Sequence, residues 1–287
     1  MFQDPDYIDN RQFTSIHKIV VGLLDRPLAL EIKDRIVDID AVDAHGKTAV
    51  AWVAARKERA TLQTLLEAGA NPDIIDNERY TAIFHAAEAP DPGCVSLLLE
   101  HRSNPNHMDA LGATAFHRAC EADNDPCLLE PFITGGININ LHQGRSGDTG
   151  VAGASREGRL SNVCYLLDKK ANPNVVNAAG ETAIFMAIHH NRPKILERLL
   201  HTGASPNICN RKGQSILHSA ARLGKPDVLM ILQDIDYGDI DPELEDDNKM
   251  KAVDYFAERQ KIVNVDPEVQ RAFRELMKIA NAKYRSE

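Results

Sequence analysis

The sequence predicts an all-α solenoid, in which short helix-turn-helix pairs stack in a row with turn or hairpin tips along one edge. One observation is a unit that recurs along the chain and is clearest over 177–209. Another is the 33 to 35 residue spacing of the hydroxyl residues placed to cap the first helix of each unit: Thr14, Thr48, Thr81, Thr114, Thr149, Thr182 and Ser215. Two helices this short cannot bury their apolar faces alone, so each unit needs similar neighbours.

Within the unit 177–209, Gly180 indicates a turn and Thr182 is placed to cap the first helix. Its hydroxyl can accept a hydrogen bond from an unpaired backbone N–H one turn later. A tight connection at 191–193 and an exit at Gly203 bound a second helix. Apolar residues follow with helical spacing: Ile184, Ala187 and Ile188 in the first helix, and Ile195, Leu196, Leu199 and Leu200 in the second.

The spacing near 33 residues, with a turn and two helices per period, resembles the ankyrin repeat. The resemblance is carried by DAHGKTAVA from Asp43, LLEAGANPD from Leu65, DALGATAFHRAC from Asp109 and NRKGQSILHSAA from Asn210. Ala stands where the family's Thr-Pro-Leu-His signature has Pro, at Ala49, Ala82, Ala115 and Ala183. Because Ala is the best helix former, the helix is not weakened. The resemblance implies an ankyrin-repeat solenoid with β-hairpin or turn tips.

We expect a single linear array, because repeat number sets the length of such a domain. Its parts are an extended leader (1–13), an N-terminal capping repeat (14–42) with a second helix around 29–37, six ankyrin repeats, and an acidic linker with a C-terminal helical cap (243–287). The six repeats are 43–75, 76–108, 109–143, 144–176, 177–209 and 210–242. In the cap, Asp266 and Pro267 suit a helix start, and a closing stripe is expected at Ala272, Phe273, Leu276, Met277, Ala280 and Tyr284.

Two passages depart from the regular pattern. Pro126 and Pro131 lie in the expected second helix of 109–143, and glycines recur from Gly135 to Gly153. These features favour an enlarged hairpin loop and a local soft point, since the lysine and spacing of a phosphate-binding loop are absent. The second passage, 234–247, carries eight carboxylates. It is interpreted as a solvated loop or, alternatively, as a contact for a basic partner.

Composition narrows the class of protein further. No run reaches the ~18 apolar residues that a membrane span needs, and the first ten residues lack a secretory signal pattern. The five scattered cysteines favour reduced thiols, hence a cytoplasmic or alternatively nuclear protein. With a net charge of −9 and no cluster of Lys and Arg, the chain is expected to bind neither nucleic acid nor membrane.

No catalytic residue, metal ligand or cofactor site is predicted. The resemblance implies that His17, His117 and His218 are structural, with rings that hydrogen-bond backbone between repeats. His189 and His190 are adjacent, so on a helix they point about 100° apart and do not form an i, i+4 ligand pair. Neither HExxH nor GxSxG occurs. The chain is therefore expected not to be an enzyme.

The ankyrin resemblance implies that a partner binds the concave side, formed by the tips and the exposed first-helix positions. Mapped through the capping hydroxyl, the expected binding residues are Trp52, Tyr80, His85, Arg118, Glu121, Arg156, Met186, His189, Arg211 and Arg222. Trp, Tyr and Arg supply much of the binding energy at interfaces, which favours a protein partner. Trp52, the single Trp, can alternatively pack against the preceding repeat.

The function expected from these observations is a monomeric scaffold or adaptor that binds a protein partner, one with a basic patch, through the concave groove. Two alternatives stay open: a regulatory or substrate-recruiting segment of a larger multidomain enzyme, and a stand-alone enzyme or small-molecule binder. A weaker resemblance of residues 15–56 to ankyrin arrays at the ends of large fungal proteins points to a longer parent protein. As surface residues, Trp52, Arg118 and Arg156 are expected to tolerate Ala within about 0.5 kcal/mol.

Overall fold

The computed structural model describes residues 11–25, 27–28, 32, 38–89, 91–123, 125–235 and 240–284. Helices joined by turns make up this part of the chain, and the only bridge between extended segments within it is the isolated pair Val42 and Thr48. The predicted all-α class is therefore confirmed. Contacts divide the chain into two compact units, Met1–Asn138 and Ile139–Glu287. The expected leader, apart from residues 11–13, and the expected helix at 29–37, apart from residue 32, lie outside the described residues.

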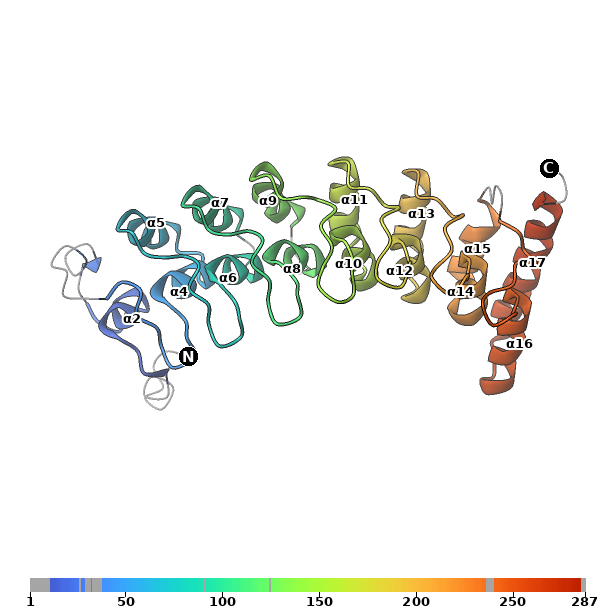
Figure 1. The fold of residues 1–287 in the computed structure, drawn as a ribbon, viewed down its shortest axis with the longest axis horizontal. Helices are drawn as coiled ribbons and strands as arrows, with labels where there is room; N and C mark the ends of the chain where they lie inside the picture. Colours follow the sequence, from blue (N-terminus) through green and yellow to red (C-terminus); the bar gives the residue numbers. More distant parts are fainter. Residues whose placement is uncertain are drawn as a thin grey trace. The chain divides into compact units, whose positions relative to one another are not determined.

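The first unit consists of helix pairs, with the first helix of each pair in one layer and the second in another (Figure 1). The first layer contains α2 (Ser15–Val20), α4 (Ala49–Ala55), α6 (Ala82–Glu88) and α8 (Ala115–Glu121). The second contains α5 (Arg59–Glu67), α7 (Pro92–Glu100), the 3-10 helix η1 (Pro126–Leu129) and α9 (Glu130–Thr134). Each helix packs on the equivalent helix of the next repeat, as α4 does on α6 and α7 on α9.

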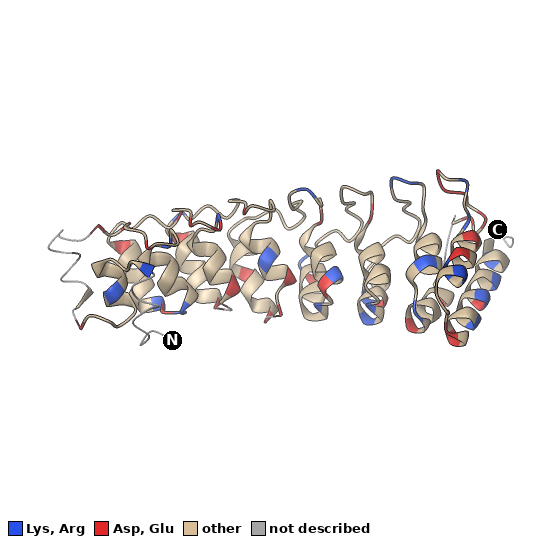
Figure 2. Cartoon of the chain, turned by 90° about the horizontal axis from the view of Figure 1, so that it is seen from below, with Lys and Arg blue, Asp and Glu red and all other residues tan. Residues whose placement is uncertain are grey.

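The second unit repeats this arrangement (Figure 1). Its first layer contains α10 (Gly150–Glu157), α12 (Ala183–His189), α14 (Ile216–Leu223) and α16 (Ala252–Ile262). Its second layer contains α11 (Leu160–Asp168), α13 (Pro193–His201), α15 (Pro226–Gln233) and α17 (Pro267–Tyr284). In each unit the turns that precede the first-layer helices project from the same edge of the helices (Figure 2).

The predicted apolar stripes of α12 and α13 form the core apart from Leu200, which is half-buried. Ile184, Ala187 and Ile188 of α12 are fully buried, and so are Leu166 of α11 and Leu199 of α13. Burying a leucine in such a site contributes roughly 2–5 kcal/mol relative to Ala. The stripe of α17 is buried from Ala272 to Ala280, while Tyr284 is 43% exposed. Tyr284 was therefore wrongly assigned to the stripe, because it is the last residue of the helix and its side chain is exposed.

The first-layer helices begin where the hydroxyl spacing predicts, but the hydroxyls do not all cap. Thr48, Thr114 and Thr149 accept hydrogen bonds from backbone N–H groups of the first turn. Thr182 has the extended backbone of an N-cap but makes no such bond. The predicted bond at Thr182 is therefore wrong. At Asp266, by contrast, the carboxylate accepts from the Glu268 N–H at 2.8 Å, as expected for the start of α17.

Two histidines link neighbouring repeats as the resemblance implied. The Nε2–H of His17 donates to the Lys47 carbonyl at 2.9 Å, and that of His218 donates to the Met250 carbonyl at 3.1 Å. In each ring Nδ1 lies within hydrogen-bond distance of the hydroxyl three residues earlier, at 2.7 Å from Thr14 Oγ1 in His17 and at 3.0 Å from Ser215 Oγ in His218. Burial lowers the pKa of His17, which favours this neutral ring.

The glycine-rich passage is shorter than expected. Gly150 and Gly153 lie inside α10 and are buried, so the loop ends at Thr149. The expectation that these two glycines belong to an enlarged hairpin loop was wrong, because Thr149 caps a helix despite its glycine content. Before the glycine-rich passage, the expected second helix of repeat 109–143 is divided into η1 and α9, which contain Pro126 and Pro131 respectively.

Candidate protein-interaction surface

Six of the described tips, all but the one before α10, are built around an Asp or Asn side chain five residues before the helix cap. At Asp43 the Oδ1 atom accepts from the N–H groups of His45 and Lys47 at 2.8 and 2.9 Å. The same two bonds recur at Asp76, Asp109, Asn177, Asn210 and Asp246. Asp and Asn suit this position because their short side chains can mimic a turn of backbone.

The second oxygen of each tip Asp accepts a hydrogen bond from a residue of the following helix. In the first unit these donors lie nine positions later. Asp43 Oδ2 lies 3.1 Å from Trp52 Nε1, Asp76 Oδ2 lies 2.8 Å from His85 Nε2, and Asp109 Oδ2 lies 2.9 Å from Arg118 Nε. Indole, imidazole and guanidinium donors differ chemically, but all three satisfy a buried carboxylate, which is costly to leave unpaired.

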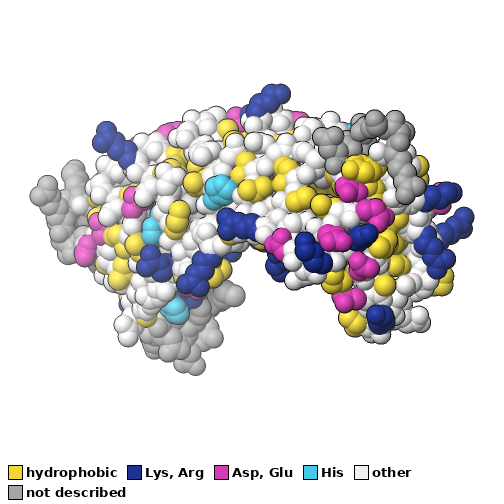
Figure 3. Space-filling view, turned by 45° about the vertical axis from the view of Figure 1, so that its right-hand side comes forward, with side chains coloured by type: hydrophobic (Ala, Val, Ile, Leu, Met, Phe, Trp, Pro, Cys, Tyr) yellow, Lys and Arg dark blue, Asp and Glu magenta, His cyan; other side chains and the backbone are white. Residues whose placement is uncertain are grey.

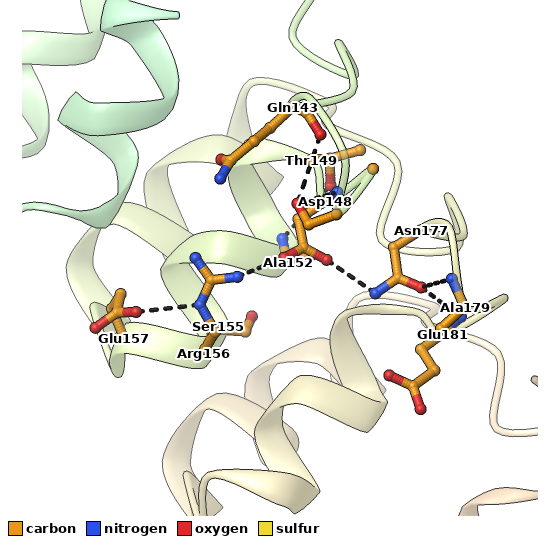
Figure 4. A network of polar contacts seen from close by, with 12 residues as sticks. Gln143, Asp148, Thr149, Ala152, Ser155, Arg156, Glu157, Asn177, Ala179 and Glu181 are labelled. Carbon is orange, nitrogen blue, oxygen red and sulfur yellow. Dashed lines mark hydrogen bonds and ion pairs between the residues drawn. The ribbon is translucent and has the colours of Figure 1, made fainter. Parts of the chain in front are cut away.

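The second unit continues this pattern at its two ends. The tip before α10 carries one extra residue, and its carboxylate is Asp148. Asp148 Oδ2 lies 2.5 Å from Arg156 Nη1, and Asp148 Oδ1 accepts from Asn177 Nδ2 (Figure 4). Asp246 accepts from the Tyr255 hydroxyl at 2.7 Å and from Gln214 Nε2 at 3.0 Å. Burial by itself raises the pKa of the Asp246 carboxyl, but these hydrogen bonds outweigh burial and lower it.

The two intervening tips carry an amide in place of the carboxylate. Asn177 Nδ2 donates to Asp148 Oδ1 at 2.9 Å, and Asn210 Nδ2 donates to Glu181 Oε1 at 3.4 Å. An amide needs no cationic donor, and the residues nine positions later are Met186 and Ser219. Cationic side chains in this region are therefore not required to neutralise a tip.

Between these tips and helices lies a hollow of about 310 Å³. It is lined by polar side chains from two neighbouring repeats and from α16: Glu181, His189, Asn210, Arg211, Lys212, Gln214, His218, Ser219, Arg222 and Tyr255. The ring of His189 lies 3.1 Å from Ser219 Oγ. Burial, and then the positive charge of Arg222, lower the pKa of His189 to about 4. Burial raises the pKa of Glu181.

The structure brings three of the ten expected binding residues together in this hollow: His189, Arg211 and Arg222. In the second unit Arg156 is bound to Asp148, with 25% of its side chain exposed. Met186 is 6% exposed and packs within the stack. Sequence reasoning therefore identified part of the hollow.

The other five expected residues belong to the first unit. Tyr80 and Glu121 are half-buried, and His85 is 4% exposed. Arg118 keeps 26% of its side chain exposed beside Asp109. Trp52 packs edge-on against Phe13 of the expected leader, with ring centroids 5.4 Å apart. Trp52, Arg118 and Arg156 each bind a buried carboxylate. Replacing any of them by Ala is therefore expected to cost more stability than the ~0.5 kcal/mol of an ordinary surface substitution.

Sequence reasoning missed the carboxylate Asp246 and its partner Tyr255. A signal was present: DDNKMKAV from Asp246 has the spacing of DAHGKTAV from Asp43, with Lys249 in place of Gly46. Lys249 adopts a φ of 62°, the left-handed conformation in which glycine is usual. Asp246 thus belongs to a structured tip within the acidic run, and nearby Glu243 forms an ion pair with Lys251 at 2.9 Å.

The described part of the chain offers neither a metal site nor a membrane-spanning helix. No group of three or more His, Cys, Asp or Glu residues there could hold a metal ion. No described helix is both long and apolar enough to cross a membrane.

Comparisons with known proteins place this architecture in a family. The family profile described as ankyrin repeats (three copies) matches residues 50–143 and 151–246, and the chain therefore belongs to the ankyrin repeat family. Ankyrin repeats are general protein–protein interaction modules, and their homologues are typically non-catalytic. A search of curated proteins finds no match.

Solved structures show the same fold. The ankyrin repeat domain of human ASB11 is 20% identical, with a TM-score of 0.64 over 80% of this chain and 98% of that one. The ankyrin repeat domain of Bcl-3, described as a unique member of the IkappaB protein family, is 22% identical, with a TM-score of 0.66 over 80% and 99%. At these identities the likeness defines the fold alone.

Proposed function

We propose that this chain is a scaffold or adaptor module that binds a protein partner through the surface formed by its tips and first-layer helices. The observation that carries the proposal is the hollow of the second unit, where His189, Arg211 and Arg222 converge from two repeats. The two arginines are exposed. Exposed arginines beside a recess are the kind of residue in which interface energy concentrates.

The test combines capture of partners by the whole chain with direct titration of each purified partner. Changing His189, Arg211 and Arg222 to Ala should weaken binding by about 1–4 kcal/mol in total if the hollow contains a hot spot. Lys194→Ala, on the exposed part of α13, is the matched surface control and should bind as wild type. A partner that binds all variants equally would contradict this surface.

We also propose that the partner carries a basic patch. The exposed carboxylates Glu245 and Asp247 belong to the acidic run and can contact such a patch, which a net charge of −9 attracts. We further propose a monomer in the cytoplasm or nucleus. Light scattering coupled to size-exclusion chromatography should give the mass of one chain.

A further inference from the structure

We infer that the hollow of the second unit receives acidic side chains, Asp or Glu, from an extended segment of the protein partner. This inference rests on the proposed function and specifies the chemistry of one contact. The tip that begins at Asn210 contributes Arg211 and Lys212, and the last turn of α14 contributes Arg222. All three side chains are exposed.

These cations differ from the other arginines of the tip-facing surface. Arg118 and Arg156 are held by the buried carboxylates Asp109 and Asp148. Within the described residues, the structure gives Arg211, Lys212 and Arg222 no ion pair with a carboxylate. The two tips that line the hollow are built on Asn177 and Asn210, whose amides carry no charge that could pair with these cations.

The charges that line the hollow favour an anion. Glu181 is its one lining carboxylate, against three cations. Burial raises the pKa of Glu181, and Asn210 donates to its side chain. His189 is neutral at pH 7, since its pKa is lowered to about 4. Asp247 stands in the next tip near Gly213 but does not line the hollow. A carboxylate would gain charge-assisted hydrogen bonds from the two guanidinium groups.

The lining also indicates a side chain of a protein in preference to other anions. A small molecule gains most of its affinity from burial in an apolar pocket, whereas this hollow is lined mainly by polar groups. Nucleic acid needs many cations along a backbone, and the chain carries a net charge of −9. An acidic side chain of a partner can use these few cations while the rest of the partner contacts the neighbouring tips. Acidic and basic side chains are interspersed over the face drawn in Figure 3.

The test uses the full chain and a fluorescein-labelled oligoglutamate peptide, with binding followed by fluorescence anisotropy at an ionic strength of about 0.15 M, where the Debye length is about 8 Å. The triple variant Arg211→Gln, Lys212→Gln, Arg222→Gln should bind at least about tenfold more weakly, as expected for a charged hot spot. The matched control is Lys194→Gln, Lys225→Gln, Lys261→Gln, which removes the same charge from exposed positions outside the hollow. It should keep binding within about twofold, because distant surface charges are screened. Melting curves should show that both triple variants are folded.

Several outcomes would overturn the inference. They are absence of oligoglutamate binding, equal weakening in both triple variants, equal binding of an oligolysine peptide, and tighter binding of a single-stranded oligodeoxynucleotide in the hollow. A different result would contradict the proposed function itself. In that case the wild-type chain would bind no protein partner in direct titration, even if it binds oligoglutamate. A partner whose affinity is insensitive to the hollow variant would leave the proposed function standing and contradict this inference.

Discussion

At the scale of single residues, the tip carboxylates explain why unlike side chains occupy one helical position. Asp43, Asp76 and Asp109 are each 5% exposed, and Asp246 is 2% exposed. A buried carboxylate requires hydrogen bonds to both oxygens, since leaving it unpaired costs several kcal/mol. The turn supplies N–H donors to one oxygen, and the following helix supplies a Trp, His, Arg or Tyr donor to the other.

Arg118→Ala should therefore destabilise the protein by about 1–3 kcal/mol, because it leaves Asp109 buried without its cation. Urea unfolding followed by circular dichroism measures the change. The second substitution Asp109→Asn, made in the same chain, should restore part of the loss, since Asn177 and Asn210 form the same turn without a cation. A loss within about 0.5 kcal/mol for Arg118→Ala would instead agree with an ordinary surface residue.

His189 should make stability depend on pH between about 6.5 and 4, because burial and Arg222 lower its pKa to about 4 from the ordinary 6.5. In this window the unfolded chain binds the proton and the folded chain does not, so stability is fully present above pH 6.5 and falls as the pH falls. His189→Gln should flatten the fall when thermal melts are compared across this range. Identical pH profiles for both proteins would contradict the assignment.

At the scale of elements, neighbouring tips are joined through backbone. The Arg211 N–H donates to the Ala179 carbonyl at 2.8 Å, and the Ala178 N–H donates to the Ser146 carbonyl at 2.9 Å. Gly180 lies at this junction with a φ of +79°. A Cβ atom on Gly180 would stand 2.7 Å from the backbone nitrogen of Arg211, whereas one on Gly203, at a φ of +87°, would meet nothing within 4 Å. Position 180 thus requires glycine both for its left-handed backbone and for its close contact with the next tip. Position 203 requires glycine only for its left-handed backbone.

The pair Gly180→Ala and Gly203→Ala separates conformational strain from contact between repeats. Gly203→Ala should cost about 1–2 kcal/mol for the left-handed backbone alone. Gly180→Ala should cost at least about 1 kcal/mol more, because Arg211 and its tip must move. Chemical denaturation of both variants measures the difference. Equal losses would show that the next tip adapts without cost.

At the scale of the whole molecule, stability is expected to vary along the chain, because each repeat contacts only its neighbours. Residues 122–149 contain the four-residue η1, the five-residue α9 and the glycine-bearing loop before α10. The helices from α12 to α15 are longer and more regular, and their apolar stripes are buried. The short elements have fewer backbone hydrogen bonds to hold them closed.

Amide hydrogen exchange should therefore be faster over 122–149 than over the helices between 177 and 232. Mass spectrometry of peptides from the full chain measures both regions in one experiment. Gly150 to Glu157 should be protected like the other helices, since α10 is capped by Thr149 and buried. Uniform protection from 122 to 232 would mean that the loop and short helices are as stable as their neighbours.

The sequence by itself determined the repeat, the helix pairs and the core, because each depends on local spacing. The hydroxyl interval located the starts of the first-layer helices, and helical periodicity identified buried residues such as Leu166 and Leu199. It also selected His189, Arg211 and Arg222, which the structure gathers in one hollow. Local spacing could do this because every repeat places equivalent positions on the same face.

Only the tertiary structure decided which polar side chains bind buried carboxylates of the protein itself and which face the solvent. Nothing in the sequence indicates that Arg118 neutralises Asp109 while Arg222 has no ion pair with a described carboxylate, since both occupy the exposed side of a first-layer helix. It also left open that the Tyr255 hydroxyl and Gln214, from different repeats, meet at Asp246. Such contacts depend on distances across neighbouring tips, and a buried carboxylate takes whichever donor those distances allow.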